Sequence, residues 1–336
     1  MKAWEIQSYG SVEGLIPTER AALSLAHDRS ILVRVLAVSL NYRDLTALRI
    51  ARPGNLSPLV PCSDAAGEVV AVGEGVTKWK VGDRVAGCFF QDWVDGPIAR
   101  ETMASAQGGP IHGVLAEEAC WHEDGAVAVP AHLSHEEAAC LPCAGVTAWH
   151  ALMEKGGLAA GQTVLVLGTG GVSVFALQFA KARGARVIVT SSSDEKLAQA
   201  RALGADETIN YRITPEWERE VYELTGKRGV DHVIEVGGAG TLEKSLASVC
   251  FGGRISLMGV LSGFEGKVNP WPIVARSVAV QGIYVGSTRM FEAMNRFVVS
   301  HTLRPVIDRV FPFDQAREAF AHLESGRHFG KVVIAL

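Results

Sequence analysis

The chain has 336 residues, of which 48% are hydrophobic and 20% are charged, and its formal net charge is -4. This length suits about two domains, and the composition is typical of a well-buried α/β protein and excludes a disordered chain. The charges form no long run of one sign, so neither nucleic acid nor an anionic membrane is an expected partner.

The N-terminal stretch MKAWEIQSYGSVEG lacks the apolar core of a secretory signal, and no segment reaches the ~20 apolar residues of a membrane helix. We therefore expect a soluble cytoplasmic protein with reduced thiols. The cysteines are Cys62, Cys88, Cys120, Cys140, Cys143 and Cys250.

Short strands separated by turns are predicted for residues 1–130. Strand candidates are 31–40 and 65–76, and a turn followed by a strand is expected over 79–87. Many short strands at this spacing predict a compact β-barrel. Residues 88–113 interrupt the pattern and are predicted to form a long loop, of the kind that is often functional.

From 131 to 276 the pattern alternates between strands and helices, which predicts a doubly wound parallel sheet. A helical stretch over 134–153 comes first. The strands expected after it are 163–168, 185–190, 207–210, 230–236 and 253–260, and the helices are 172–184, 192–204 and 240–250. Residues 277–336 are expected to mix strands with one helix around DQAREAFAHLESG.

A glycine cluster follows the first of these strands. The turn GTGGVS contains Gly168, Gly170 and Gly171 and opens a helix at Val172, but the third glycine of the G-x-G-x-x-G fingerprint is replaced by Ser173. The first glycine permits a tight turn and the second lets the backbone approach a pyrophosphate. The third permits close helix–sheet packing, a role that a small serine can keep. An ordinary turn is the alternative, but the strand before the motif and the helix and strand after it favour a dinucleotide cradle.

The end of the second strand indicates which dinucleotide binds. An NAD site usually has Asp or Glu there, whereas this strand runs into TSSSDEK with no acid before the serines. A 2′-phosphate needs room, donors and positive charge, so this arrangement favours NADPH. The residues that carry this prediction are Ser191, Ser192, Lys196 and Tyr211. Two alternatives stay open. Ser192 with Glu195 also matches a capping box of the next helix, and Asp194 is an alternative acid that could bind the ribose of NAD, although its place in the first helical turn also suits the helix dipole.

Segments along nearly the whole chain resemble the medium-chain dehydrogenase/reductase superfamily of zinc alcohol dehydrogenases and zinc-free quinone oxidoreductases. They are SLNYRDL, PLVPCSDAAGEVVAVGEGVTKWKVGDRV, LPCAGVTAW, GTGGVS, RALGADETINY, GVDHVIEVGG and HFGKVVI. The resemblance implies a GroES-like β-barrel catalytic domain of residues 1–130, completed by 277–336, and a Rossmann NADP-binding domain of residues 131–276. It also implies an active site in the cleft between them and a homodimer, for which 278–287 is a candidate edge strand.

The metal-binding positions depart from those of the zinc members. Asn41 stands where their C-x-x-D pattern has the catalytic cysteine, and Ser63 stands where their Gly-His-Glu has the histidine. Cys143 matches a third ligand position, but a catalytic zinc needs three protein ligands. The four clustered cysteines of a structural zinc site are also missing, so we expect no metal. A rearranged site of Cys62, Asp64 and Cys143 is the alternative.

The pair Cys140-x-x-Cys143 has the spacing of a redox pair or of half a zinc site. It lies in an Ala- and Leu-rich helical stretch, and no second pair exists in the sequence. Buried packing is therefore the favoured interpretation.

A metal-free site favours particular substrates. Without a metal to polarise a carbonyl, a quinone or an α,β-unsaturated carbonyl is an easier hydride acceptor than a simple ketone, because the resulting anion is delocalised. The protein then supplies orientation and a few hydrogen-bond donors. We therefore expect an NADPH-dependent quinone or enone reductase. A metal-free alcohol dehydrogenase or ketoreductase is the first alternative, and a non-catalytic dinucleotide-binding protein is the second.

The resemblance also assigns residues to the site. Asn41 and Asp44 are expected to line the nicotinamide pocket, and Tyr42 is either a donor to the substrate oxygen or a core aromatic residue. The residues matched to the nicotinamide itself are Thr147, Gly259 and Val260. Residues whose role stays open are Arg43 (solvent or cofactor phosphates), Phe89, Phe90 and Trp93 (substrate wall or anchors of the long loop) and Arg327 (one position out of register with a phosphate-binding arginine).

Overall fold

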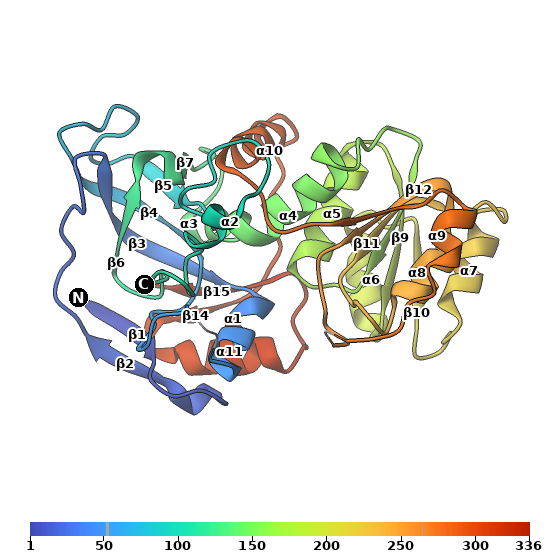
Figure 1. Cartoon of the computed structure of the whole chain (residues 1–336), viewed down its shortest axis with the longest axis horizontal. Helices are drawn as coiled ribbons and strands as arrows, with labels where there is room; N and C mark the ends of the chain where they lie inside the picture. Colours follow the sequence, from blue (N-terminus) through green and yellow to red (C-terminus); the bar gives the residue numbers. More distant parts are fainter. Residues whose placement is uncertain (52–53, 264) are drawn as a thin grey trace. The chain divides into compact units, whose positions relative to one another are not determined.

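The computed structural model describes residues 1–51, 54–263 and 265–336. The chain forms two compact units: a barrel unit of Met1–Val146 with Val285–Leu336, and a sheet unit of Thr147–Tyr284. Both chain termini lie in the barrel unit (Figure 1).

These boundaries lie later in the chain than the expected divisions after 130 and 276, because the flanking helices pack on the barrel. At the first boundary, the backbone N–H of Cys143 donates to Asp64 Oδ2 at 3.0 Å. At the second, Asn295 Nδ2 donates to the carbonyl oxygen of Ala128 at 3.0 Å.

Strand β3 is the centre of the barrel unit, since it pairs with β4, β6 and β15. The last strand of the chain therefore completes the barrel, with Val332 opposite Leu40 and Ala335 opposite Ala37. The strands are β1 (Lys2–Ile6), β2 (Leu15–Glu19), β3 (Ser30–Leu40), β4 (Asp64–Val72), β5 (Arg84–Gly87), β6 (Glu118–His122), β7 (Ala126–Ala128), β14 (Ile307–Pro312) and β15 (Lys331–Ala335). Their inward side chains form one apolar core that includes Ile31, Val33 and Val332.

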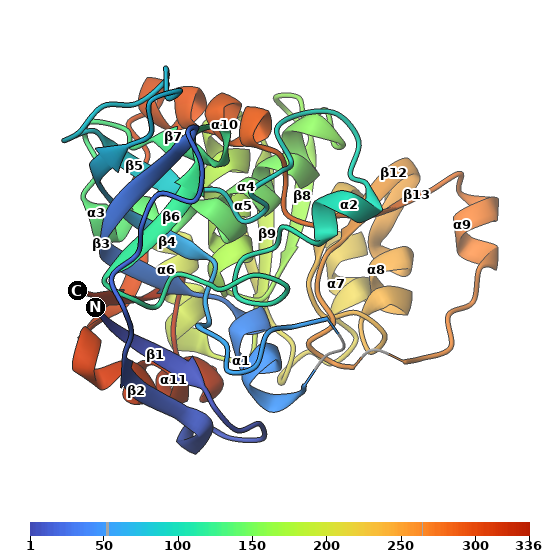
Figure 2. The same cartoon turned by 60° about the vertical axis from the view of Figure 1, so that its left-hand side comes forward.

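Several helices of the barrel unit pack against its strands. They are η1 (Val12–Gly14), α1 (Tyr42–Arg49), α2 (Arg100–Met103), η2 (Glu123–Gly125), α3 (His135–Ala139), η3 (Leu141–Gly145), α10 (Thr288–Ser300), η5 (Phe313–Gln315) and α11 (Ala316–Glu324). Figure 2 shows the β1–β2 hairpin beside α11, where Arg317 Nε donates to the carbonyl oxygen of Leu15 at 2.8 Å.

The expectation of a single helix in 277–336 is wrong, because α10 also lies there. Its buried face includes Phe291, Met294 and Val298, spaced by three and four residues, and Ser287 Oγ accepts from the N–H of Met290 to cap it.

The long loop over 88–113 is tied down by its aromatic residues and carries the short helix α2. Phe89, Phe90 and Trp93 are all buried, and the Phe90 ring lies edge-on to the other two at centroid distances of 4.7 and 5.7 Å. Their burial agrees with the anchoring role.

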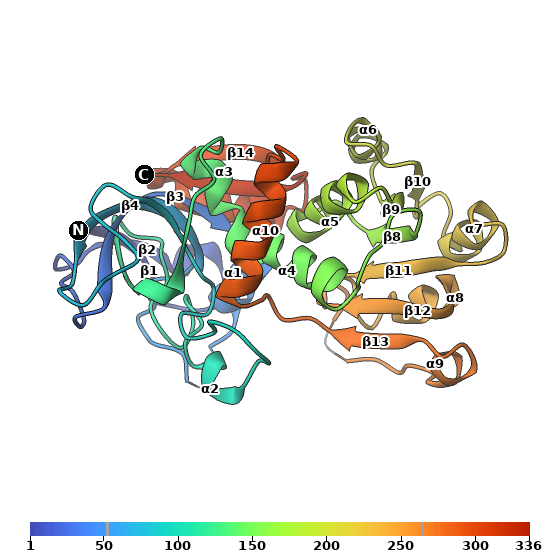
Figure 3. The ribbon, with the colours of Figure 1, turned by 90° about the horizontal axis from the view of Figure 1, so that it is seen from above.

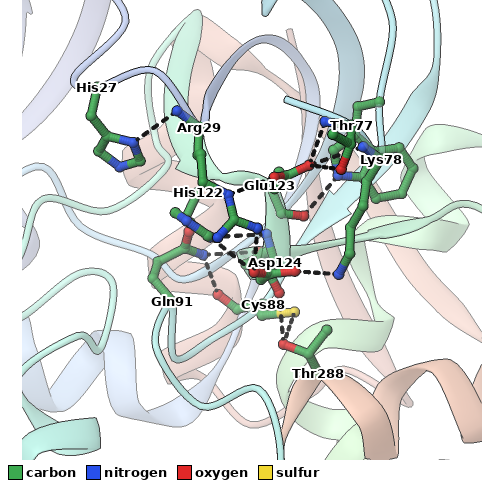
Figure 4. A network of polar contacts seen from close by, with 12 residues as sticks. His27, Arg29, Thr77, Lys78, Cys88, Gln91, His122, Glu123, Asp124 and Thr288 are labelled. Carbon is green, nitrogen blue, oxygen red and sulfur yellow. Dashed lines mark hydrogen bonds and ion pairs between the residues drawn. The ribbon is translucent and has the colours of Figure 1, made fainter. Parts of the chain in front are cut away.

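A buried carboxylate joins two further segments of the barrel unit (Figure 4). Glu123 accepts from Arg29 Nε at 2.8 Å and from the backbone N–H groups of Thr77 and Lys78 at 2.8 and 2.9 Å. Burial alone would raise the pKa of Glu123, but these donors outweigh it and lower the pKa to about 2.

The sheet unit is a parallel sheet in the order β10-β9-β8-β11-β12-β13 (Figure 3). Numbered along the chain, this is the 3-2-1-4-5-6 order of a Rossmann fold, with its switch point between β8 and β11. The strands are β8 (Thr163–Leu167), β9 (Arg186–Ser191), β10 (Glu207–Asn210), β11 (Val230–Glu235), β12 (Val249–Leu257) and β13 (Ala279–Gly282). The helices are α4 (Val146–Trp149), η4 (His150–Glu154), α5 (Gly171–Ala182), α6 (Asp194–Ala202), α7 (Trp217–Leu224), α8 (Leu242–Ser248) and α9 (Trp271–Ala275).

Candidate functional site

The start of α1 forms the first part of the candidate site. Asn41 is the residue before the helix, and its backbone N–H donates to Asp44 Oδ2 at 2.7 Å, while the N–H of Asp44 donates to the carbonyl oxygen of Asn41 at 2.9 Å. Asp44 is fully buried, and burial raises its pKa to about 6 against the opposing charge of Arg43. Asp44 thus holds the turn that presents Asn41.

A lysine that was not singled out from the sequence also meets Asn41. Lys331 begins β15, next to the end of β3, and is only 3% exposed. Its Nζ donates to the carbonyl oxygen of Leu40 at 2.5 Å and to Asn41 Oδ1 at 2.7 Å. A charged residue opening the apolar run VVIA was the signal available in the sequence, because such a residue is rarely buried unless it is paired.

Ser63, Asp64 and Cys143 lie in the same unit and are linked to one another. Ser63 Oγ donates to Asp64 Oδ1 at 2.6 Å, and the backbone N–H of Cys143 donates to Asp64 Oδ2 at 3.0 Å. Burial raises the pKa of Asp64, although Lys331 and the hydroxyl of Ser63 oppose the shift. Burial also raises the pKa of the Cys143 thiol, so this sulfur stays protonated at neutral pH.

These residues do not fit a catalytic metal ion. Asn41 Oδ1 faces an ammonium group and the hydroxyl of Ser63 is committed to Asp64. In residues 1–51, 54–263 and 265–336, no group of three or more His, Cys, Asp or Glu side chains is arranged to hold a metal. Among the residues that the structure describes, Cys62, Asp64 and Cys143 are therefore not arranged as the alternative metal site.

Tyr42 and Arg43 point to different surroundings. Tyr42 is 44% exposed, so it is not a core aromatic residue. Arg43 Nη1 donates to the carbonyl oxygen of Gln107 at 2.8 Å, and its guanidinium lies 5.0 Å from the centre of the Phe89 ring. Arg43 therefore anchors the long loop to α1.

The two cysteines of the Cys140-x-x-Cys143 pair differ in burial. Both thiols are free, and Cys140 is fully buried with its Sγ 3.2 Å from the carbonyl oxygen of Glu136. Burial raises the pKa of Cys140 to about 12. For Cys140, the packing interpretation agrees with its position.

The glycine turn of the sheet unit has the geometry of an open cradle. Gly168 adopts a φ of +74°, which favours glycine, and Gly170 precedes α5 without a side-chain cap. A Cβ on Gly170 would meet no atom within 4 Å. The N–H groups of Gly171 and Val172 begin the twelve-residue helix beside this space.

Ser173 keeps the packing role of the missing third glycine. It is buried, and its Oγ donates to the carbonyl oxygen of Leu167 at 2.7 Å. The serine therefore ties the first turn of α5 to the end of β8 and satisfies its own hydroxyl.

The ends of β9 and β10 place two of the residues expected at the 2′-phosphate, Ser191 and Tyr211, in direct contact. Ser191 lies opposite Asn210, and the N–H of Tyr211 donates to the carbonyl oxygen of Ser191 at 3.0 Å. Ser192 follows on the same strand end. Lys196 lies in the first turn of α6.

Two alternatives at this strand end have different outcomes. The prediction that Ser192 forms a capping box is wrong. Ser193 caps α6 instead, because its Oγ accepts from the N–H of Lys196 at 3.4 Å. Asp194 Oδ1 accepts from Asn210 Nδ2 at 2.7 Å, so this carboxylate is already engaged in the unit.

Glu235 is a residue that the sequence reasoning missed. It ends β11 fully buried, and its Oε1 accepts from the N–H groups of Gly237 and Gly238 at 2.7 and 3.0 Å and from Thr241 Oγ1 at 2.6 Å. Ser245 Oγ donates to its other oxygen. An acid closing the buried run VIEVGG was the available signal.

Glu235 shapes the loop next to the residues matched to the nicotinamide. A Cβ on Gly259 would lie 2.1 Å from the carbonyl oxygen of Val236, so only glycine fits there, and Val260 follows it. Thr147 is buried in α4, in the same unit. Arg327 lies exposed after α11, where its Nε donates to Ser325 Oγ at 3.3 Å.

Comparisons with known proteins agree with this architecture. Residues 27–131 match the alcohol dehydrogenase GroES-like domain, and residues 171–300 match the zinc-binding dehydrogenase family. A zinc-type alcohol dehydrogenase-like protein of Schizosaccharomyces pombe is 43% identical over 96% of this chain and 95% of its own. A 2-methylene-furan-3-one reductase of Solanum lycopersicum is 34% identical over 99% of this chain and 79% of its own. The crystal structure of an NAD-dependent alcohol dehydrogenase, 34% identical, covers 100% of both chains with a TM-score of 0.91.

Proposed function

Since this chain belongs to the medium-chain dehydrogenase/reductase superfamily and is an NAD(P)-dependent oxidoreductase, we propose that it reduces quinones or α,β-unsaturated carbonyls with NADPH and without a catalytic metal. When bound, NADPH supplies the hydride. The protein supplies orientation and donors for the acceptor oxygen.

One observation carries the metal-free proposal. At the positions where zinc members have a cysteine and a histidine, this chain has an amide that accepts from Lys331 and a hydroxyl that donates to Asp64. A nearby ammonium repels a divalent cation, and a catalytic zinc site needs three protein ligands. An acceptor whose negative charge delocalises after hydride addition suits such a site.

The proposed roles follow from the geometry of each unit. Asn41 contacts the substrate oxygen, Asp44 holds the turn that presents Asn41, and the exposed Tyr42 relays a proton. In the sheet unit, Gly168, Gly170, Gly171 and Val172 bind the pyrophosphate, and Thr147, Gly259 and Val260 bind the nicotinamide.

The preference for NADPH rests on Ser191, Ser192, Lys196 and Tyr211 at the ends of β9 and β10. Hydroxyl groups and a cation suit a phosphate, and Asp194, the fallback ribose acid, is bonded to Asn210. The solved relative that is NAD-dependent makes NADH the competing outcome of the cofactor test.

Product identification tests the reaction. Chelator-treated protein is given NADPH and a cyclic enone, and the organic product is analysed. The saturated ketone is expected, because it requires hydride at the conjugated carbon. The allylic alcohol would instead assign direct carbonyl reduction, the alternative that the alcohol dehydrogenase-like relatives favour.

Metal analysis provides an independent test. The purified protein is expected to contain well under one zinc per subunit, and one zinc per subunit would overturn the metal-free proposal. Tight NADPH binding with no turnover over a broad panel of quinones, enones and ketones would favour the third candidate, a non-catalytic dinucleotide-binding protein.

The partners that we propose are a small carbonyl or quinone substrate and a second copy of the chain. Strand β13 lies at one edge of the parallel sheet and is the surface proposed for the homodimer. Within the described residues, no helix has the length and apolar character needed to cross a membrane.

A further inference from the structure

Lys331 is the buried cation of the polar cluster formed by Asn41, Asp44, Asp64 and Lys331 in the barrel unit. Its Nζ contacts two consecutive residues, through the carbonyl oxygen of Leu40 at 2.5 Å and the side-chain oxygen of Asn41 at 2.7 Å. Its charge also lowers the pKa of Asp64 against the effect of burial. A lysine held in this way has a fixed position, unlike a lysine on the surface.

The chemistry of the ammonium group settles the orientation of the Asn41 amide. An ammonium group can only donate, so the oxygen of the amide must face it and the NH2 group must point away. Asn41 Nδ2 is buried and completes no hydrogen bond within the described residues, although the Asn41 side chain helps to lower the pKa of Asp64. A buried donor of this kind is costly unless a ligand completes it.

We propose that Lys331 is a positioning residue that fixes the Asn41 amide so that its Nδ2–H group donates to the oxygen of the reacting substrate. This inference rests on the proposed reduction. The positive charge of Lys331 polarises the amide and makes it a stronger donor. In zinc members a metal ion would stabilise the negative charge on the substrate oxygen. Here the polarised Asn41 amide stabilises it through a hydrogen bond.

The step balances with the components already named. Hydride from NADPH bonds to the conjugated carbon, the electron pair of the C=C bond moves toward the carbonyl, and negative charge develops on the oxygen. Asn41 Nδ2–H donates to that oxygen. A proton from solvent, relayed by Tyr42, adds to the neighbouring carbon and gives the saturated ketone and NADP⁺.

A double-mutant cycle on the full chain tests the coupling. Lys331→Met and Asn41→Ala are each expected to lower kcat at least tenfold, with KM changed less than threefold. The double variant is expected to be no slower than the slower single variant, because Lys331 acts through Asn41. Losses that multiply would overturn the proposal, as would wild-type kcat in K331M.

Two controls separate positioning from other roles. Ser39→Ala perturbs the same β3–β15 contact, where Ser39 Oγ donates to the carbonyl oxygen of Val332 at 3.3 Å, and is expected to keep kcat within twofold. The Kd of NADPH is expected to stay unchanged in K331M. An increase in that Kd matching the loss of kcat would assign Lys331 to the cofactor and overturn the inference.

Lys331→Gln replaces K331M in these tests if K331M does not fold. The side-chain NH2 group of the new glutamine can still donate to Asn41 Oδ1. The kcat of K331Q is expected to lie between those of wild type and N41A, with no further loss in the N41A background; a further loss there contradicts the coupling.

A measurement without turnover separates this inference from the proposed function. The side-chain amide resonance of Asn41, identified by its loss in N41A, is expected to shift in K331M or K331Q in the absence of substrate. An unchanged resonance would reject the positioning role. If wild type reduces neither enones nor ketones with NADPH, the proposed function fails. The Asn41 resonance still shows whether Lys331 positions the Asn41 amide.

Discussion

Glu123 shows how one side chain sets the pH dependence of stability. Its pKa in the folded protein is about 2, below its ordinary value of 4.5, so folding favours the ionised form. The stabilisation is therefore fully present above about pH 4.5 and is lost as the pH falls toward 2. We expect Glu123→Gln to lower the free energy of unfolding by ~1–3 kcal/mol at pH 7, since it weakens hydrogen bonds to a charged group.

Urea denaturation at pH 7, 4 and 3 checks this expectation, and the difference from wild type should shrink at the lower values. Asp124→Asn is the matched control, because the neighbouring carboxylate makes only partly exposed ion pairs with Arg29 and Lys78. Such pairs contribute ~0–1 kcal/mol. A loss in E123Q that is the same at every pH would show that the charge of Glu123 is not its cause.

Lys196 is the residue on which cofactor choice depends most directly. Lys196→Ala should raise the Kd of NADPH roughly tenfold, because the 2′-phosphate loses a cation, while the Kd of NADH stays within about twofold. Fluorescence titration of both cofactors measures the ratio. Lys181→Ala is the control and should change neither Kd. Lys181 lies on α5, where its Nζ forms an ion pair with Asp206 at 2.8 Å. Equal weakening of both cofactors in K196A would refute the assignment.

Single residues were predictable where a motif fixes their spacing. Ser173 was expected to keep a packing role, and its contact with Leu167 explains how it does so. Lys331 and Glu235 were missed because their partners come from distant parts of the sequence or from backbone groups. Lys331 reaches Asn41 across 290 positions, and Glu235 accepts from the backbone of Gly237 and Gly238.

At the scale of elements, Gly170 at the start of α5 and Gly259 after β12 have opposite requirements. Gly170 has a φ of -77° and open space around its Cβ position, so Gly170→Val should fold. The branched side chain would fill the space proposed for the pyrophosphate, and we expect NADPH binding to fall at least a hundredfold. Binding titration and circular dichroism check the two halves of this prediction.

Gly259→Ala is the contrasting variant, because its Cβ would lie 2.1 Å from the carbonyl oxygen of Val236. We expect it to lower the thermal midpoint, whereas G170V lowers binding at nearly unchanged stability. Retained NADPH affinity in G170V would place the cradle elsewhere.

The elements themselves were predictable in proportion to their periodicity. β8, α5 and β9 begin and end within two residues of their expected limits, because buried strands and an amphipathic helix alternate there. α10 was missed although Phe291, Met294 and Val298 share one face, because Phe297, Val298 and Val299 also form a strand-like run. The cap of α6 shifted by one residue because TSSSDEK offers adjacent serines, and only the structure shows that Ser193 is used.

At the scale of the whole molecule, the free edge of β13 is the feature that most needs an explanation. In the sheet order β13 comes last, after β12, so one side of this strand has no neighbour in the sheet of the described chain. Trp271 and Val274 on the preceding helix α9 are 67% and 68% exposed. Exposed apolar groups beside an open edge favour pairing with a second copy across a two-fold axis.

We therefore expect a homodimer that Val280→Lys converts to a monomer, because a lysine on an edge strand opposes pairing between sheets. Sedimentation velocity at micromolar concentration measures the change. Ile213→Lys is the matched control, since Ile213 is also exposed but follows β10 at the opposite edge of the sheet. A dimer that persists in V280K would move the interface away from β13. A wild-type protein that is a monomer would contradict the proposed dimer. The exposed apolar residues of α9 would then need another explanation, such as a different protein partner.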